Sequence, residues 1–349
     1  MSLTGPAGNI GDALIRRETL EWARGTSDEL VAYVGEAPDV WLHQLGVPTG
    51  TIVLRTKRSV PRWLWLLTTA PRRPVLVLEA GEVPLDRGNG LRELVFLAET
   101  LIVRIKRGVV VRPPRGIRAP SNPSLRLHVL AARWSNVALW RDEKSAALAG
   151  STHVVPDIGF AAGVRAGSTE DARDELIISL RGARPMPSAA WIETVRAFAR
   201  NEGLRIRTVV QVREDEERSR ELADALGGEF DPWGDIDAIS QERNLRARYD
   251  HARMVISDRM HVLVLAALSG AVPVELVPAP TGKIAAAFEV IGLPGVSHDS
   301  RDADVEALTE VLTAQRGRRD EVIAAVAAAA DKIAHLESRM RETVRRARR

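Results

Sequence analysis

Three ionisable residues fall within four positions of the stretch MVISDRMHVL, residues 254–263. The apolar run before them predicts a strand and the apolar run after them predicts a helix. Asp258, Arg259 and His261 therefore lie on a strand-to-helix turn. A helix N-terminus offers unused N–H groups and the positive end of the helix dipole. Arg259 adds a fork of donors and His261 titrates near neutral pH, so the turn predicts an anion site beside a proton-transfer group.

A structural interpretation of the same turn stays open. In it, Asp258 caps the helix, Arg259 lies at the surface and His261 is a satisfied core side chain. Neither interpretation is excluded by the residues alone.

A glycine-rich loop, GPAGNIGDALI at residues 5–15, runs into a helix that we expect to begin near Asp12. Glycines let the backbone approach a ligand, and a helix start accepts negative charge. The loop lacks both the full GxGxxG pattern and a Walker lysine. The alternative is a helix cap at Asp12 with Gly11 as a turn residue.

Short apolar runs alternate with helical patterns along the chain. This order predicts an α/β fold with mainly parallel sheets, in two Rossmann-like halves that face a cleft. In such sheets, ligands bind at the carboxyl ends of strands. The runs that predict strands are 51–56, 74–81, 109–112, 136–141, 152–159, 175–182, 205–212, 254–258 and 272–277.

The length of 349 residues favours two domains. The small, polar stretch 161–175 predicts their boundary. We therefore expect an N-terminal domain over 1–165 and a C-terminal domain over 166–302. Residues 303–349 predict helices that end in the basic tail RRARR.

Composition excludes several classes of protein. The chain has no cysteine, which excludes disulfides and cysteine-ligated metals. A net charge of +3 argues against a dedicated nucleic-acid binder. We find no signal peptide and no apolar run of the roughly 18–20 residues that span a bilayer. We therefore expect a cytoplasmic protein without a metal or a cofactor.

Two motifs resemble the polysaccharide pyruvyl transferase family: GNIGDALI at 8–15 and SDRMHVLVLAALSGAVPVEL at 257–276. The resemblance spans roughly residues 5 to 290. It implies a fold similar to the glycosyltransferase B type. It also implies transfer of a pyruvyl group from phosphoenolpyruvate to two hydroxyls of a sugar, as a ketal. Further segments match in order, namely WRDEKS at 140–145, VVPDIGF at 154–160, IISLRG at 177–182 and TGKIAAAF at 281–288.

The chain departs from the family pattern at its start and after one strand. Only MSLT precedes the glycine loop, where the family has a full strand, so the first strand is short or missing. GARP follows IISLR, where the family has further acidic residues.

The resemblance assigns roles to particular residues. Phosphoenolpyruvate carries a carboxylate and a phosphate, which arginine forks fit. Arg181 and Arg259 are the expected donor ligands, with Lys283 as a third. His261 is the expected acid or base, with Arg259 beside it in catalysis.

On the acceptor side, the resemblance implies that Asn9, Gly11 and Asp12 face the cleft from the first domain. Arg141 and Asp157 are expected to buttress the domain seam. The expected partners are phosphoenolpyruvate and a saccharide, either a cell-surface polysaccharide or its lipid-linked precursor.

Two other functions stay open. A glycosyltransferase of the same fold would use a nucleotide sugar, with Glu275 as a ribose ligand. A degenerate homologue would only bind cell-envelope glycans, although the presence of Arg259 and His261 argues against it.

The segment VPRWLWLLTTAPRRP, residues 60–74, mixes tryptophans, leucines and arginines. It predicts a buried helix or, alternatively, an interfacial patch that approaches a lipid-linked acceptor. The basic tail is a solvated helix end or an aid to binding anionic lipid. With the patch and the tail on lipid, the protein would sit at the inner face of the membrane.

Overall fold

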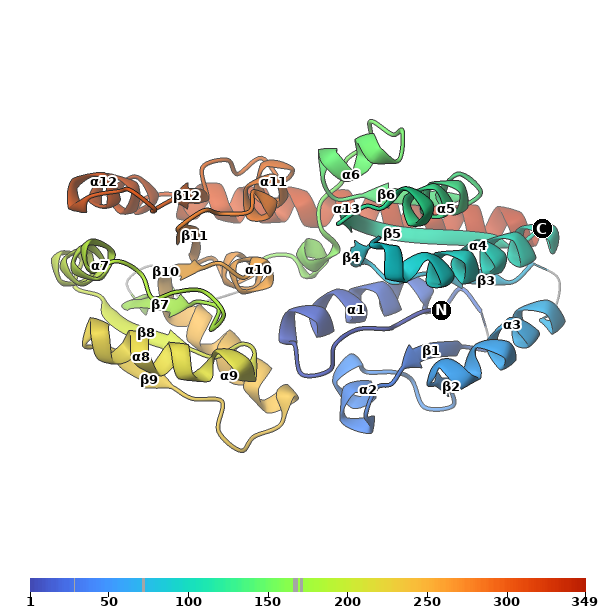
Figure 1. Ribbon diagram of the computed structural model, residues 1–349, viewed down its shortest axis with the longest axis horizontal. Coiled ribbons are helices and arrows are strands. Elements are labelled where there is room, and N and C mark those ends of the chain that lie inside the picture. Colours follow the sequence, from blue (N-terminus) through green and yellow to red (C-terminus); the bar gives the residue numbers. More distant parts are fainter. Residues whose placement is uncertain (28, 71–72, 166–168, 170–171) are drawn as a thin grey trace. The chain divides into compact units, whose positions relative to one another are not determined.

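The computed structural model describes residues 1–27, 29–70, 73–165, 169 and 172–349 (Figure 1). The chain forms two α/β units. Unit 1 comprises Met1–Ala7, Asp12–Ala161 and Asp331–Arg349, and unit 2 comprises Gly8–Gly11 and Ala162–Ala330. The division near residue 161 falls inside the stretch 161–175 that we expected to separate the domains.

Parallel strands form the core of unit 1, and β5 pairs on one side with β3 and β4 and on the other with β6. A second pair, β1 with β2, is also parallel. These strands are β1 (Val31–Gly35), β2 (Ile52–Arg55), β3 (Val75–Val77), β4 (Gly81–Pro84), β5 (Val109–Arg118) and β6 (Val137–Trp140).

The first residues of the chain join these two groups of strands. Ser2 donates its N–H to the Val77 carbonyl at 3.0 Å, and Leu3 donates to the Tyr33 carbonyl at 2.9 Å. Ser2 also forms a parallel bridge with Tyr33. The segment before the glycine loop is therefore short but takes a strand's place between β1 and β3.

Strand β5 contains two adjacent prolines at its centre, Pro113 and Pro114. Proline has no N–H to donate to a neighbouring strand. The pairing of β5 accordingly changes partner there, from β3 to β4, and its register with β6 shifts between Arg112 and Arg115.

Helices of unit 1 follow its strands and cover them with apolar side chains. One buried cluster brings Trp63 and Leu67 against Leu76, Phe96 and Val110. The helices are α1 (Ile10–Ala23), α2 (Asp39–Leu45), α3 (Val60–Thr69), α4 (Gly90–Ile105), α5 (Asn122–Arg133) and α6 (Glu143–Leu148). The 30-residue helix α13 (Arg319–Arg348) extends through the residues where the two units divide.

Unit 2 has one six-stranded parallel sheet in the order β12-β11-β10-β7-β8-β9. This is a Rossmann-like arrangement, in which chain order runs outward in both directions from the central pair β7 and β10. The strands are β7 (Glu175–Ser179), β8 (Arg205–Val209), β9 (Glu229–Asp231), β10 (Ala252–Ser257), β11 (Val272–Val277) and β12 (Ser297–Asp299).

The helices of unit 2 connect these strands (Figure 1). Val262–Leu268 of helix α10 are all buried, as expected of a helix that is apolar on every side. The helices are α7 (Ala189–Asn201), α8 (Glu216–Leu226), α9 (Ala238–His251), α10 (Met260–Leu268), α11 (Lys283–Glu289) and α12 (Val305–Gln315).

A buried arginine, Arg173, bonds to the backbone at the start of β10 and at the ends of two helices. Arg173 donates through Nη1 to the carbonyls of Tyr249, at 3.2 Å, and Ala252, at 2.7 Å, and through Nη2 to the Ser269 carbonyl. One guanidinium thus satisfies carbonyls at the ends of α9 and α10 and at the start of β10.

The structure departs from the sequence predictions in a few elements. The stretch 152–159 is not a strand, since only Val154 pairs, in a single bridge with Trp140. Pro156 and Asp157 follow at once and turn the chain. Strand β5 runs six residues beyond the predicted 109–112. Residues 303–330 group with unit 2 and 331–349 with unit 1, where the sequence set 303–349 apart.

Candidate anion site in unit 2

The candidate site lies where strands β7 and β10 end. These strands are adjacent and parallel, with Ser179 paired to Ser257. The chain continues from β7 to Arg181 and from β10 to Asp258 and Arg259. Strand order reverses between β7 and β10, and ligands bind in such sheets outside the carboxyl ends at the reversal.

Asp258 organises the loop that follows β7. It is buried, and its Oδ1 accepts the N–H of Arg181 at 3.0 Å. Its Oδ2 pairs with Nε of Arg184 at 2.7 Å and with Nε of Arg181 at 3.7 Å. Asp258 therefore does not cap helix α10, whose N-cap is Arg259. It holds two arginines.

Asp215 holds Arg259 in the same way. Asp215 is buried, and its Oδ2 accepts a hydrogen bond from Nε of Arg259. Its Oδ1 accepts the N–H of Gly182 at 2.9 Å. A guanidinium has five N–H donors, so a contact through Nε fixes its orientation while other donors of the fork point elsewhere. The interpretation of Arg259 as an ordinary surface residue is therefore wrong.

Arg184 makes a second contact, and one further arginine, Arg218, adjoins it. Nη1 of Arg184 donates to the Pro278 carbonyl at 2.6 Å, which ties the loop after β7 to the loop after β11. Nη1 of Arg218 donates to the Arg184 carbonyl. Nε of Arg218 pairs with Glu221 at 2.9 Å. Three arginines, 181, 184 and 259, thus pair with two buried carboxylates, and this excess of cations suits a multiply charged anion.

His261 lies in the first turn of α10, against the glycine loop. Gly11 groups with unit 2. A Cβ added to Gly11 would lie 2.5 Å from Cβ of His261 and 2.9 Å from Nε2 of Gln211. Any side chain at this position would therefore displace the histidine, which explains the glycine. The glycine loop therefore contacts His261, which follows Arg259 by two residues.

The matched segment of the chain contains this group of arginines and the histidine. Residues 117–274 match the polysaccharide pyruvyl transferase family. The resemblance drawn from the sequence is confirmed across this range. The glycine loop and Lys283 lie outside it, so their roles in pyruvyl transfer remain predictions. No curated protein matches the chain.

Solved structures of similar fold include UDP-GlcNAc 2-epimerase from Methanocaldococcus jannaschii, with a TM-score of 0.55, 13% identity and coverage of 96% of this chain and 99% of that one. Anabaena Alr3699/HepE in complex with UDP and glucose has a TM-score of 0.51 and 14% identity, with 98% and 97% covered. A putative UDP-N-acetylglucosamine 2-epimerase from Listeria monocytogenes has a TM-score of 0.51 and 15% identity, and the match covers 98% of this chain and 97% of that one. The fold is that of glycosyltransferases and epimerases of the B type, as predicted.

Asn9, and not Asp12, caps the start of helix α1. The helix starts at Ile10, and Oδ1 of Asn9 accepts the N–H of Gly11 at 3.0 Å. Asp12 lies in the first turn and pairs with Nη1 of Arg16 at 3.0 Å. The prediction of a helix start near Asp12 was therefore late by two residues, because the polar side chain of Asn9 supplied the earlier cap.

Lys283 opens helix α11 and is exposed, after a left-handed Gly282. It follows β11, the neighbour of β10, so it approaches the same end of the sheet. Its role as a donor ligand stays a prediction.

Glu275 is poorly placed for a ribose. It is buried within β11 and its Oε2 accepts the Ser297 hydroxyl at 2.5 Å. Burial raises the pKa of its carboxyl, and the charge of Asp258 adds to the rise. An open carboxylate at the mouth of the site is what a ribose contact requires, and Glu275 is not one in this arrangement.

Arg141 and Asp157 pair inside unit 1. Nη1 of Arg141 donates to Oδ2 of Asp157 at 2.8 Å, and Oδ1 of Asp157 accepts the N–H of Gly159 at 2.9 Å. Both side chains are buried, and despite that burial the aspartate raises the pKa of Arg141. The pair is buried within unit 1, and its predicted role at the domain seam stays a prediction.

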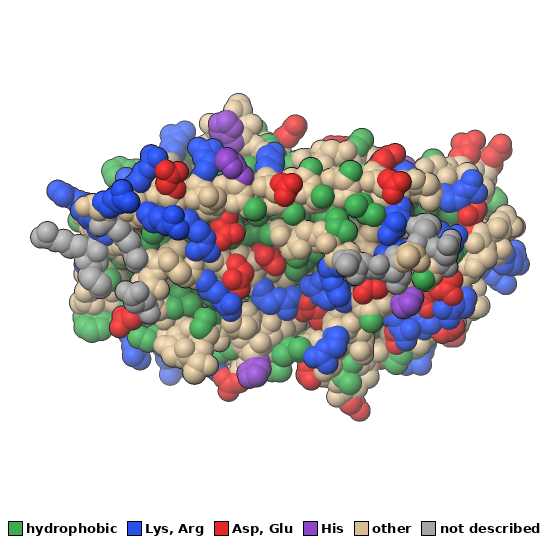
Figure 2. Space-filling view, turned by 180° about the vertical axis from the view of Figure 1, so that it is seen from behind, with side chains coloured by type: hydrophobic (Ala, Val, Ile, Leu, Met, Phe, Trp, Pro, Cys, Tyr) green, Lys and Arg blue, Asp and Glu red, His purple; other side chains and the backbone are tan. Residues whose placement is uncertain are grey.

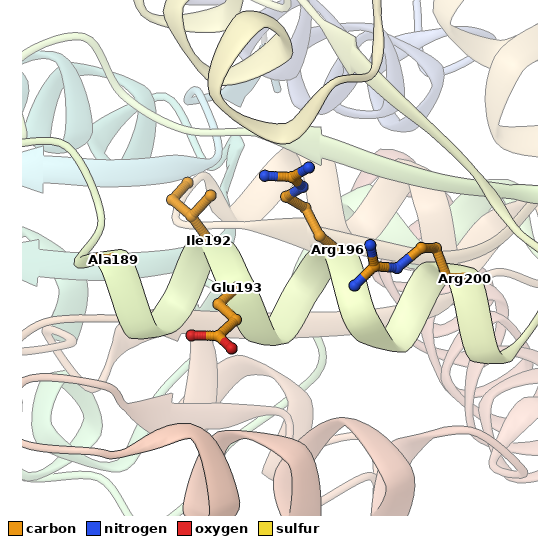
Figure 3. Close-up of a pocket in the computed structure, with 5 residues that line it drawn as sticks. All are labelled: Ala189, Ile192, Glu193, Arg196 and Arg200. Carbon is orange, nitrogen blue, oxygen red and sulfur yellow. The ribbon is translucent and has the colours of Figure 1, made fainter.

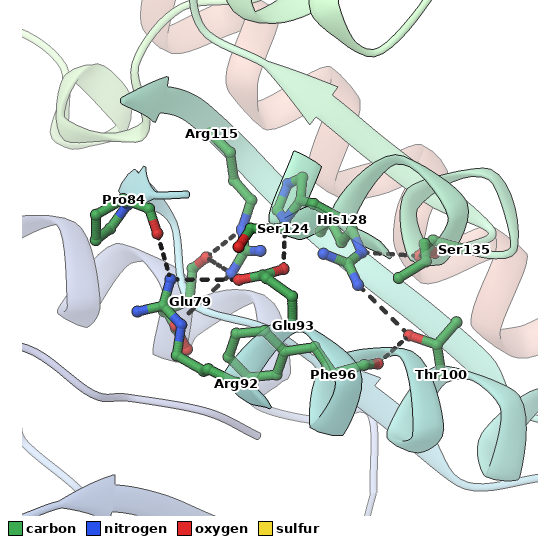
Figure 4. Close-up of polar contacts among 12 residues, drawn as sticks. Glu79, Pro84, Arg92, Glu93, Phe96, Thr100, Arg115, Ser124, His128 and Ser135 are labelled. Atoms are coloured by element: carbon green, nitrogen blue, oxygen red, sulfur yellow. Dashed lines mark hydrogen bonds and ion pairs between the residues drawn. The ribbon is translucent and has the colours of Figure 1, made fainter. Parts of the chain in front are cut away.

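Unit 1 also contains a buried polar network (Figure 4). Nδ1 of His128 lies 2.7 Å from Oε2 of Glu93, with both side chains fully buried. Burial lowers the pKa of His128 to about 4. Burial alone would raise the pKa of Glu93, but the His128 hydrogen bond and nearby arginines lower it overall. The histidine is therefore neutral and donates to an ionised carboxylate near pH 7.

The other part of this network keeps a carboxyl protonated. Oε1 of Glu99 accepts the indole N–H of Trp63 at 2.9 Å. Burial raises the pKa of Glu99 to about 8. Burial and the neighbouring Arg115 lower the pKa of Arg112 to about 9, and its Nε donates to the Ser135 hydroxyl at 3.0 Å. These groups are packed inside the unit, so we assign them to stability.

An open hollow of about 550 Å³ lies along helix α7 (Figure 3). Its lining contains none of the predicted site residues. Arg196 and Arg200 stand side by side on the helix surface, with Ile192 and Glu193 nearer its start. This hollow therefore does not support a catalytic role for the residues that line it.

Sequence reasoning missed four residues at the site: Arg184, Gln211, Asp215 and Arg218. Arg184 lies in the segment GARP, which was noted only as a departure from the family. Asp215 lies in the acidic run REDEERS, which looks like the charged first turn of a helix. One clue was available: an arginine that binds a ligand at the end of a strand needs a buried carboxylate to orient its guanidinium group.

Proposed function

We propose that this protein transfers a pyruvyl group from phosphoenolpyruvate to a pair of hydroxyls on a saccharide, forming a cyclic ketal. One observation carries the proposal. The segment that matches the pyruvyl transferase family contains Arg181, Arg184, Arg259 and His261, and these side chains gather at the strand ends of one sheet.

The donor would be held by preoriented guanidinium groups. Phosphoenolpyruvate carries a carboxylate and a phosphate, and an arginine fork binds either in a bidentate manner. Asp215 orients Arg259, and Asp258 orients Arg181 and Arg184. Side chains fixed before binding lose less conformational entropy when the ligand arrives. The first N–H groups of α10 add donors at the same place.

The reaction balances without a cofactor. The methylene carbon of the donor gains a proton and becomes a methyl group. Two acceptor oxygens form bonds to the central carbon, and the bond from that carbon to the phosphate oxygen breaks. Of the two hydroxyl protons, one replaces the proton given to the methylene and the other leaves with inorganic phosphate.

His261 is the proposed proton carrier. It follows Arg259 by two residues on the first turn of α10, so it adjoins the donor's anionic groups. An imidazole is the side chain that most often gives and takes protons in catalysis. It would protonate the methylene and regain a proton from the acceptor hydroxyl.

Thermal unfolding with candidate donors tests the proposal. At about 100 times its dissociation constant, a ligand stabilises the folded state by roughly 2.7 kcal/mol. We expect phosphoenolpyruvate to raise the unfolding temperature and UDP-glucose to leave it unchanged. Pyruvate and inorganic phosphate, which each carry one anionic group of the donor, should act more weakly.

The opposite result identifies the rival function. Stabilisation by UDP-sugars with no response to phosphoenolpyruvate would contradict pyruvyl transfer and favour a nucleotide-sugar glycosyltransferase. Equal effects of phosphoenolpyruvate and inorganic phosphate would indicate a general anion site without recognition of the carboxylate.

A further inference from the structure

Three helices of unit 1 end along one edge of its sheet. Helices α3, α4 and α5 are followed after a few residues by the parallel strands β3, β5 and β6. Strands β3 and β5 begin opposite each other, since Val75 pairs with Val109, and β6 begins two residues along β5, where Val137 pairs with Val111. We call the surface formed by Trp65, Arg73, Arg104–Arg107, Arg133 and Trp134 the strand-start surface.

Hydrogen bonds connect the three helix ends. Nζ of Lys106 donates to the Thr68 carbonyl of α3 at 2.5 Å. Nη1 of Arg104 donates to Oδ1 of Asn136, beyond the end of α5, at 3.0 Å. The Arg73 N–H donates to the Lys106 carbonyl at 3.1 Å. The strand-start surface is therefore continuous and does not consist of separate loops.

Large apolar side chains project from this surface. Ile105 is 81% exposed, Trp65 is 60% exposed and Trp134 is 51% exposed. The inner face of α3 is used differently, because Trp63 and Leu67 are buried in the core. The prediction of a buried helix over 60–74 therefore holds for one face only. Trp65, on the other face of α3, is not packed in the core.

The charge around these apolar side chains has one sign. Residues 60–78, over α3 and the start of β3, contain three Lys or Arg, and residues 100–111, over the end of α4 and the start of β5, contain three. Residues 119–136, over α5, contain two. None of these segments contains Asp or Glu. Arg73, Ile105, Lys106 and Arg107 line a common hollow. Figure 2 shows several Lys and Arg side chains toward the left end of the view, with fewer Asp and Glu side chains among them. Helix ends attract cations, but that does not account for the absence of carboxylates or for the exposed indoles.

We propose that the strand-start surface binds the interface of a membrane that contains anionic phospholipid. Exposed apolar tips surrounded by cations match such an interface, where tryptophan settles at the headgroup level and lysine or arginine meets lipid phosphate. None of the helices among the described residues is both long and apolar enough to cross a bilayer, so the contact would be peripheral. This inference does not depend on the proposed reaction.

Vesicle sedimentation tests the inference. The full chain would be mixed with vesicles of phosphatidylcholine alone or with about 30% phosphatidylglycerol, at low salt. We expect sedimentation with the anionic vesicles and none with the neutral ones. Sodium chloride at high concentration should release the protein, because salt screens the attraction between charges.

Matched variants at opposite ends of the same elements locate the surface. Trp65→Ser with Ile105→Ser should lower the fraction bound about tenfold or more, since the apolar tips enter the interface. Leu91→Ser, on a 74% exposed side chain at the other end of α4, should leave binding unchanged. Arg107→Gln should lower binding about fivefold, whereas Arg118→Gln, at the far end of β5, should not.

Two results would overturn the inference. The first is no sedimentation with anionic vesicles at low salt by a chain that shows its normal melting curve. The second is equal loss of binding by the Leu91 and Trp65/Ile105 variants. Binding to a mixed-sequence single-stranded RNA, lost in the Trp65/Ile105 variant while vesicle binding is absent, would assign the surface to nucleic acid instead.

Discussion

The position of His261 is determined by its neighbours on both sides. Arg259 precedes it on the turn, and the backbone of Gly11 lies so close that a methyl group would not fit beside it. A histidine packed so tightly keeps one orientation. In the proposed reaction, this places a titrating ring beside the anionic groups of the donor.

We expect His261→Gln to lower turnover by about 100- to 10,000-fold, the usual loss for a general acid or base. Glutamine keeps a hydrogen-bonding group but does not exchange protons near neutral pH, so phosphoenolpyruvate binding should persist. The measurements are a pH–rate profile with a pyruvylatable saccharide and calorimetry of donor binding.

The matched control is His251→Gln, which changes an exposed histidine of the same unit at the end of α9. It should behave as the wild type. Full turnover in His261→Gln would make His261 a packing residue, and joint loss of binding and turnover would make it an anion ligand.

Individual residues were partly predictable. Arg259, His261 and Arg181 follow apolar strands, and the rule that ligands bind at strand ends identifies them from the sequence. The partners of these residues were not predictable. Asp258 pairs with Arg184, and Asp215 with Arg259, across separations of 74 and 44 positions that only the order of strands in the sheet brings together.

At the scale of elements, unit 2 depends on a buried cation that no motif revealed. Arg173 is fully buried and donates to carbonyls at the ends of α9 and α10 and at the start of β10. Without Arg173, these buried carbonyls would lose a hydrogen-bond donor. Leaving a buried polar group unsatisfied costs roughly 1–3 kcal/mol.

Arg173→Met should therefore lower the free energy of unfolding by about 3 kcal/mol or more, measured by urea denaturation. Methionine fills a similar space but donates no hydrogen bond. Arg301→Met is the control, since Arg301 and its partner Asp299 are about half exposed and such pairs are worth about 0–1 kcal/mol. Equal destabilisation by the two variants would contradict the role given to Arg173.

Most elements followed from hydrophobic pattern, but strands β1, β4, β9 and β12 were missed. Strands β9 and β12 have three residues each, EFD and SHD, with charged or polar side chains. At the rim of a sheet, such strands have little apolar surface to bury, so no periodic pattern marks them. Strand β5 was cut short in prediction because prolines normally end a strand.

At the scale of the whole molecule, stability should depend on pH through Glu99. Its pKa is about 8 in the folded chain and close to its ordinary value when unfolded. The folded state therefore holds a proton that the unfolded state releases between about pH 4.5 and 8. This contribution to stability is fully present below the unfolded pKa and is lost as pH rises through the folded pKa.

Glu99→Gln should remove this part of the pH dependence. Glutamine still accepts the Trp63 hydrogen bond but never ionises, so the variant should gain stability over the wild type as pH rises from 5 to 8. Urea denaturation at several pH values measures the difference. Glu36→Gln, on an exposed side chain of the same unit, is the control and should track the wild type. A constant difference across this range would show that Glu99 does not titrate there.

The adjacent prolines of β5 have a consequence for amide hydrogen exchange. Pro113 and Pro114 carry no exchangeable amide, and the partner strand changes at that point from β3 to β4. In a hydrogen-exchange experiment, the two prolines would separate two segments of slowly exchanging amides within this ten-residue strand. Each segment would report on one half of the sheet, so slow opening of the β3 side and of the β4 side could be timed separately within one continuous strand.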